Sequence, residues 1–208
     1  MTLAKRNYYL LIDGSGSMDE PAGAGYSGTR WEAVEEVAIS LAKKIAKSDP
    51  DGIDIAVFQG SRLRTFENQT DESSVRKIFD TMEPFSTTPL HLAVAYVVDH
   101  FVAQNSEVEP TFGIVLTDGA PNDGSLVVRE LKRVGDFMKS KGLPDEMFTL
   151  WFIQVGDDPK GTAYLQMLDG DEKDTRVKQI VGYDLVDTTP ITKLEGSIED
   201  MVLKAIQD

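Results

Sequence analysis

Residues 8–17 read Tyr-Tyr-Leu-Leu-Ile-Asp-Gly-Ser-Gly-Ser, an apolar run that ends at an acidic residue and a glycine-serine repeat. The apolar part, Tyr8–Ile12, predicts a strand that is buried on both faces. Because a carboxylate cannot lie unpaired in the core, we expect Asp13 at the carboxyl end of this strand, where open α/β sheets bind ligands. The two glycines are expected to let the backbone bend, so that Ser15 and Ser17 turn toward Asp13. This all-oxygen set suits Mg²⁺, Mn²⁺ or Ca²⁺.

The remainder of the chain alternates apolar runs with segments of helical spacing. Strands are predicted at Tyr8–Ile12, Ile53–Gln59, Leu63–Glu67, Phe112–Leu116, Phe148–Val155 and Lys178–Tyr183. Helices are predicted at Arg30–Lys47, Glu72–Met82, Leu90–Ala103, Ser125–Lys141, Thr162–Leu168 and Ser197–Ile206.

These elements predict one α/β domain over residues 1–208. Alternating strands and helices imply a mostly parallel sheet that is covered on both faces. The turn at Gly60 and Ser61 indicates a hairpin, and therefore one antiparallel edge strand. The expected architecture is a Rossmann-like, doubly wound, six-stranded sheet.

The amino-acid composition and net charge of the chain exclude several kinds of site and argue against some kinds of partner. The chain has no cysteine, which excludes a disulfide scaffold, a thiolate metal site and a cysteine nucleophile. Its two histidines, His91 and His100, are too few for a zinc site built from histidines alone. A net charge of -14 argues against nucleic acid and anionic membranes as partners. No apolar run is long enough to span a membrane and no signal segment precedes the first strand, so we expect a cytoplasmic protein, monomeric when isolated.

Two further oxygen ligands come from later in the chain. Asp118 follows the predicted strand Phe112–Leu116, and Thr88 stands just before the apolar helix that begins at Leu90. If the strands that precede Asp13 and Asp118 are neighbours at the point where strand order reverses, their loops meet over one crevice. Thr88 would bring a third hydroxyl to the same edge of the sheet.

The pattern Asp-x-Ser-x-Ser, then Thr-Pro-Leu before a buried helix, then a strand that ends in Thr-Asp-Gly resembles the von Willebrand factor A domain family with its metal-ion-dependent adhesion site. The resemblance covers essentially the whole chain, and Gly-Ala-Pro-Asn at residues 119–122 resembles the bacterial and intracellular branch. It implies that one divalent cation, Mg²⁺ by default or Mn²⁺ or Ca²⁺, is held by Asp13, Ser15, Ser17, Thr88 and Asp118. Thr88 is chosen over Thr87 because the family's threonine directly precedes the helix start.

The resemblance also implies a role. Domains of this kind dock an Asp or Glu of a partner protein onto the cation, and intracellular members serve as adaptors, some with AAA+ ATPases and some in stress-response complexes. The loops at residues 19–29 and 156–161 are expected to set partner choice, because loops on a rigid scaffold carry specificity. The rim acids Asp123, Asp157 and Asp158 are interpreted as solvated turn residues.

Three other classes of protein fit the sequence less well: a metal-dependent enzyme, a nucleotide-binding module, and a structural domain with a vestigial site, the last because all five expected ligand positions are filled. The first is a metal-dependent enzyme for phosphoryl transfer or hydrolysis. It is disfavoured because Ser15 stands where a haloacid-dehalogenase-like phosphatase needs a second Asp, and because no Gly-x-Ser-x-Gly elbow is present. The second is a nucleotide-binding module, disfavoured because Asp19 occupies the last glycine position of the dinucleotide fingerprint. We therefore expect a binding module and not an enzyme.

Overall fold

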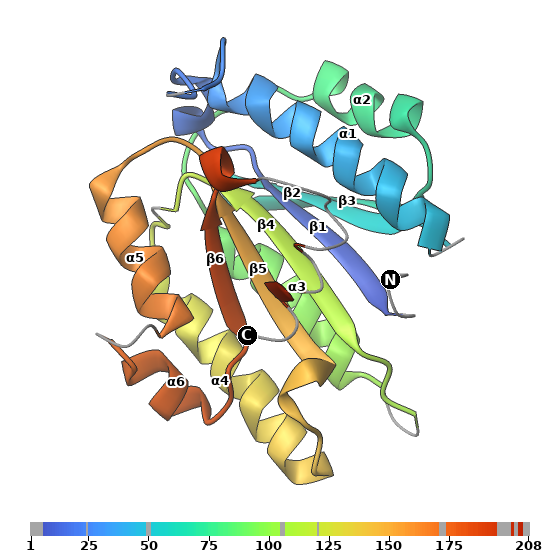
Figure 1. The fold of residues 1–208 in the computed structure, drawn as a ribbon, viewed down its shortest axis with the longest axis vertical. Helices are drawn as coiled ribbons and strands as arrows, with labels where there is room; N and C mark the ends of the chain where they lie inside the picture. The colour runs from blue at the N-terminus through green and yellow to red at the C-terminus, as the bar shows by residue number, and fades with distance from the viewer. Residues whose placement is uncertain are drawn as a thin grey trace.

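A computed structural model describes residues 6–23, 25–48, 51–104, 107–119, 121–170, 174–194, 201 and 204–205. It contains one six-stranded sheet in the order β3-β2-β1-β4-β5-β6, with helices on both faces (Figure 1). The strands are β1 (Asn7–Asp13), β2 (Ile53–Gln59), β3 (Arg62–Gln69), β4 (Thr111–Thr117), β5 (Phe148–Gln154) and β6 (Val186–Pro190).

Strand β1 lies in the middle of the sheet, parallel to β2 on one side and to β4 on the other. Strand β3 pairs antiparallel with β2 at one edge, and β6 pairs parallel with β5 at the other. The predicted Rossmann-like fold, mostly parallel with one antiparallel edge strand, is therefore confirmed. Its strand order reverses between β1 and β4, the place where such sheets bind ligands.

Five of the six described helices follow predicted segments, with bounds that differ by a few residues, and the sixth falls on a segment predicted as a strand. The helices are α1 (Arg30–Ser48), α2 (Glu72–Thr81), α3 (Leu90–Val102), α4 (Gly124–Lys141), α5 (Pro159–Asp169) and α6 (Arg176–Val181). Short 3-10 turns are η1 (Gly16–Asp19), η2 (Asp145–Met147) and η3 (Ile191–Lys193).

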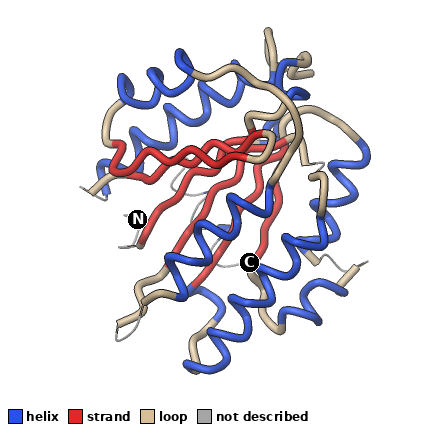
Figure 2. Tube along the Cα trace, turned by 180° about the vertical axis from the view of Figure 1, so that it is seen from behind, coloured by secondary structure: helices blue, strands red, loops and turns tan. Residues whose placement is uncertain are grey.

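Two apolar layers sandwich the sheet. Helices α1 and α2 cover one face, and α3, α4 and α5 cover the other, as the two opposite views show (Figure 1, Figure 2). Successive residues of β1 point to opposite layers, so Leu10 and Ile12 pack toward α1 while Leu11 packs toward α3. The side chains on both faces of β1 are buried from Tyr8 to Asp13, which explains the continuous apolar run in its sequence.

The prediction of an edge strand at Lys178–Tyr183 is wrong. Residues 178–181 belong to helix α6, residues 182–183 follow it, and the sixth strand is β6, a few residues further along the chain. Val177 and Val181, one helical turn apart, are buried, whereas Ile180 is 51% exposed. Gly182 then ends the helix in the left-handed conformation, with φ of 81°.

Only a few residues near the carboxyl end of the chain are described. The predicted last helix, Ser197–Ile206, lies mostly outside the described residues, which include only positions 201, 204 and 205 of it. Over the described ranges, the structure contains no helix with the length and apolar character needed to cross a membrane.

Candidate metal centre

Asp13 is the last residue of β1 and is fully buried. Its two carboxylate oxygens have different donors. Oδ1 accepts the backbone N–H of Ser15 at 2.9 Å, and Oδ2 accepts the hydroxyl of Thr117 at 2.6 Å. Thr117 Oγ1 in turn accepts the backbone N–H of Gly119 at 3.1 Å. The carboxylate is therefore held rigidly between the ends of β1 and β4.

The environment of Asp13 disfavours its negative charge. Burial raises the pKa of Asp13 to about 6, against the opposing effect of the hydrogen bond from Thr117. The negative charge of Asp118 raises this pKa further, which shows that the two carboxylates interact. A buried pair of acidic groups is most stable when a cation or a proton accompanies it.

Ser15 and Ser17 present their hydroxyls in the turn that follows β1. Ser15 is buried, Ser17 is half-buried, and their hydroxyl oxygens lie 3.2 Å apart. The turn tightens into η1, in which the N–H of Met18 donates to the Ser15 carbonyl at 3.0 Å. The sequence thus folds so that both hydroxyls emerge on the same side of a single turn.

Of the two glycines in this turn, Gly14 is the one that a neighbouring side chain approaches closely. Neither Gly14 nor Gly16 has a positive φ, so the expected bend uses backbone angles open to other residues. A Cβ at Gly14 would lie 2.7 Å from the Gln59 side-chain oxygen. The N–H of Gly14 donates to the carbonyl of Phe58 at 2.9 Å, and this bond ties the turn to the end of β2.

Thr88 is buried just before α3 and is joined to the loop after β4. Its N–H donates to Asn122 Oδ1 at 2.5 Å, and the N–H of Asn122 donates to the Thr88 carbonyl at 3.2 Å. The neighbouring Thr87 is exposed, and its hydroxyl donates to the carbonyl of Gly60 at 3.1 Å. The two threonines therefore contact different loops, and it is Thr88 that is hydrogen-bonded to the loop that carries Asp118.

Asp118 follows β4 and is 3% exposed. Its Oδ2 accepts a hydrogen bond from Arg30 Nη1 at 3.1 Å, whereas its Oδ1 is buried without a hydrogen-bond partner. A buried carboxylate oxygen without a donor costs free energy unless something else satisfies it. Oδ1 of Asp118 is therefore an oxygen that could bind a cation at this site without giving up a hydrogen bond.

Sequence reasoning missed two residues of this cluster. The sequence shows Thr117 only as part of the Thr-Asp-Gly motif, yet its hydroxyl donates to the Asp13 carboxylate. The sequence marks Arg30 only as the start of a helix, yet its side chain donates to Asp118, which is 88 residues away along the chain. One signal for Arg30 was available, because a cation in the first turn of a helix opposes the helix dipole and needs a reason to be there.

The donor set fits a hard divalent cation. Carboxylate and hydroxyl oxygens are the ligands that Mg²⁺, Mn²⁺ and Ca²⁺ prefer. Across the part of the chain that is described, no cluster of three or more His, Asp or Glu side chains could hold a metal. A cation at this sheet edge would therefore depend on the hydroxyls of Ser15, Ser17 and Thr88 as well as on the two carboxylates.

The rim acids have mainly local partners. Asp123 caps α4 by accepting the N–H of Ser125 at 3.2 Å, and Asp158 caps α5 by accepting the N–H of Lys160 at 3.1 Å. Asp157 is exposed. Their interpretation as turn residues is refined for two of them, since helix capping accounts for Asp123 and Asp158.

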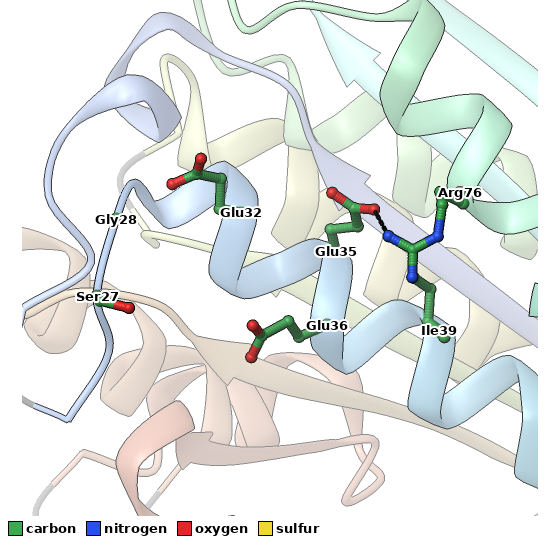
Figure 3. Close-up of a pocket in the computed structure, with 7 residues that line it drawn as sticks. All are labelled: Ser27, Gly28, Glu32, Glu35, Glu36, Ile39 and Arg76. Carbon is green, nitrogen blue, oxygen red and sulfur yellow. Dashed lines mark hydrogen bonds and ion pairs between the residues drawn. The ribbon is translucent and has the colours of Figure 1, made fainter.

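A hollow lies on the outer side of α1 (Figure 3). It is lined by Ser27, Gly28, Glu32, Glu35, Glu36, Ile39 and Arg76. Its charged groups include pairs that explain their presence: Arg76 bonds Glu35 at 2.9 Å, and Glu32 accepts the N–H of Thr29 at 2.8 Å. Thr29 Oγ1 accepts the N–H of Glu32 in return, which is a capping box that starts α1.

Comparison with known proteins identifies relatives of this fold. Residues 7–185 match the sequence model of the von Willebrand factor type A domain. Three similar solved structures are the manganese-loaded TRAP protein of Plasmodium vivax, the VWA domain of SpRpn10, and a von Willebrand factor type A protein from Catenulispora acidiphila. No match was found among curated proteins.

The structural likeness is moderate and the sequence identity low. TRAP has a TM-score of 0.57 and 19% identity, with 91% of this chain and 70% of that chain covered. The SpRpn10 domain has a TM-score of 0.56 and 12% identity, with 95% of this chain and 93% of that chain covered. The Catenulispora acidiphila protein has a TM-score of 0.57 and 18% identity, with 98% of this chain and 43% of that chain covered. At such identities the likeness speaks for the shared fold.

Proposed function

Because this chain belongs to the von Willebrand factor type A domain family, we propose that it is a divalent-cation-dependent protein-binding module. Domains of this family are generally interaction modules without enzymatic activity. Asp13, Ser15, Ser17, Thr88 and Asp118 would hold one Mg²⁺ or Mn²⁺, with Ca²⁺ as the third candidate. The partner would be a protein that offers an Asp or Glu side chain at this edge of the sheet.

The observation that carries the proposal is the unpaired, buried Oδ1 of Asp118 beside a second buried carboxylate. The pKa of Asp13 is raised to about 6, so near neutral pH the cluster holds negative charge that lacks full compensation inside the protein. A divalent cation would both bind the unpaired Oδ1 of Asp118 and compensate the negative charge of the two carboxylates. The manganese that the Plasmodium vivax TRAP structure carries supports a cation as the family's ligand type.

The chain's own residues would divide the work. Thr117 and the backbone of Ser15 fix the Asp13 carboxylate, so this group does not have to move when a cation arrives. Hydroxyls supply neutral oxygen ligands, which leave more of the positive charge uncompensated than carboxylates would. When bound, the cation would supply a Lewis-acidic position for a carboxylate oxygen from outside.

An enzyme is the weaker alternative. The hydroxyl of Ser15 pairs with that of Ser17, and the two histidines lie on α3, where His100 Nδ1 pairs with the Tyr96 carbonyl at 2.8 Å. Among the described residues neither histidine is hydrogen-bonded to Ser15, so its hydroxyl lacks the paired base that nucleophilic catalysis would need. The bacterial or intracellular type, the cytoplasmic location and the AAA+ ATPase or stress-response partners remain predictions from sequence.

Calorimetric titration of metal-stripped protein with Mg²⁺, Mn²⁺ and Ca²⁺ tests the proposal. We expect saturable binding at one site, abolished in Asp13→Ala and weakened about tenfold or more in Ser17→Ala, because each removes a proposed ligand. Asp157→Asn is the matched control, since it removes an exposed acid near the site and should bind like the wild type. Equal binding in Asp13→Ala, or no saturable binding to the folded wild type, would refute the cation site.

A further inference from the structure

Arg30 occupies an unusual position for a cation. It is the first residue of α1, where the helix dipole favours negative charge, and its side chain is only 9% exposed. Nη1 donates to Asp118 Oδ2 at 3.1 Å and to the carbonyl of Ser17 at 3.2 Å. Nη2 pairs with Glu20 at 3.2 Å. One guanidinium therefore connects the loop after β1 with the loop after β4.

The protein is shaped to receive this side chain. The Thr29–Glu32 capping box fixes the start of α1, and therefore the point from which Arg30 extends. On the far side of the guanidinium, a Cβ at Gly156 would lie 2.6 Å from Arg30 Nε. Gly156 also has a φ of 77°, which only glycine adopts without strain. A side chain at position 156 would therefore collide with Arg30, and the backbone there also requires glycine.

Hydrogen bonding alone does not explain the burial of Arg30. Its Nε is buried without a hydrogen-bond partner, so the side chain does not use all of its donors. What it does supply is a fixed positive charge. The formal charges of Asp13, Asp118 and Arg30 add to minus one, whereas the two carboxylates alone would carry minus two. Glu20, the third partner, has a side chain that is 61% exposed and is screened by solvent.

Arg30 also makes the two oxygens of the Asp118 carboxylate different from each other. It takes Oδ2 and leaves Oδ1 without a partner. A guanidinium is always charged and holds a carboxylate in a defined orientation. Arg30 can therefore remain in place while Oδ1 faces a different ligand, so the two are not required to compete for the same oxygen.

We propose that Arg30 is a positioning residue that sets the charge of the metal centre. It orients Asp118 and removes one unit of negative charge, which weakens the hold on a dication but strengthens the attraction for an anionic partner group. With a dication the three residues would total plus one, and without Arg30 they would total zero. This inference rests on the proposed function, because it presumes that the site takes a divalent cation.

Two opposite changes in Arg30→Met would test this role. We expect Mn²⁺ to bind about tenfold more tightly, because a unit charge close to the site is removed. At saturating Mn²⁺, acetate should bind about tenfold more weakly, because the centre loses its net positive charge. Calorimetry measures the first affinity, and broadening of the acetate methyl proton resonance by the Mn²⁺-loaded protein measures the second.

Control variants separate charge from structure. Arg76→Met removes an exposed arginine of α2 and should change neither affinity. Arg30→Lys keeps the charge but loses the planar fork, so its Mn²⁺ affinity should move less than that of Arg30→Met. Arg30→Gln is a second neutral variant and carries the same prediction if Arg30→Met does not fold, as judged by its unfolding transition.

Each outcome decides between the readings. If Arg30 only held the loops together, its neutral variants would bind both Mn²⁺ and acetate more weakly, and the inference would be overturned. Unchanged affinities would overturn it as well, and would leave the cation site itself intact. Absence of Mn²⁺ binding by the folded wild type would instead refute the proposed function, and this inference with it.

Discussion

Asp13→Asn should make the metal-free protein more stable at neutral pH while removing its capacity to bind a cation. Asp13 is fully buried, and at pH 7 its carboxylate must be charged in a place that disfavours charge. Asparagine is nearly the same size. Its Oδ1 can still accept the N–H of Ser15, and its Nδ2 can donate to the hydroxyl of Thr117. The substitution therefore removes the charge and largely keeps the hydrogen bonds.

The size of the expected change in the free energy of unfolding follows from the pKa of Asp13. In the folded protein the pKa of Asp13 is raised to about 6, from 3.8 in an unperturbed aspartate. Two pKa units correspond to about 3 kcal/mol. Because the folded state binds the proton more tightly, this contribution is fully present below pH 3.8 and is lost as pH rises through about 6. Above that pH the free energy of unfolding should not change further on account of Asp13.

The assay is urea unfolding of wild type and Asp13→Asn in a chelating buffer across this pH range. Subtracting one curve from the other cancels the other acidic groups to first order. The advantage of the variant should grow by about 2 kcal/mol between about pH 4.5 and pH 7, and then level off. A difference that stays flat, or that shrinks with rising pH, would refute the claim that burial of this carboxylate dominates.

Two further substitutions probe the same cluster. Thr117→Val keeps the shape but removes the hydroxyl that bonds Asp13, so we expect about 2 kcal/mol lower stability at neutral pH and weaker Mn²⁺ binding, measured by urea unfolding and calorimetry. Gly156→Ala places a Cβ against Arg30 at a positive φ and should cost about 2 kcal/mol or more. Gly182→Ala is its control, since that glycine has a positive φ but no atom within 4 Å of the added carbon. Equal losses in the two alanine variants would contradict the packing of Arg30 under Gly156.

The candidate centre was partly readable from sequence because some of its residues are close along the chain. Asp13, Ser15 and Ser17 lie within five residues, so their convergence follows from a single turn after a buried strand. Thr88 and Asp118 could be added only through the family resemblance and the logic of parallel sheets. Whether all five bind one cation is a question for titration.

The sequence by itself determined the elements whose pattern is local. The apolar run before Asp13 predicts a strand buried on both faces, and the turn residues after β2 predict a hairpin, and the structure confirms both. The segment Lys178–Tyr183 misled because it is short, and its few apolar residues fit either period. Its buried face is defined by contact with α4, where Gly135 lets the carbonyl of Val181 approach.

Tertiary structure decided the contacts that join distant parts of the chain. It placed β1 beside β4, and so brought the Thr117 hydroxyl to Asp13. It also turned Arg30 toward Asp118, although the sequence around Arg30 marks only a helix start. Local pattern fixes the period and ends of an element because it depends on neighbours along the chain. Charge balance in a buried site depends on neighbours in space, which only the folded arrangement of β1, β4 and α1 supplies.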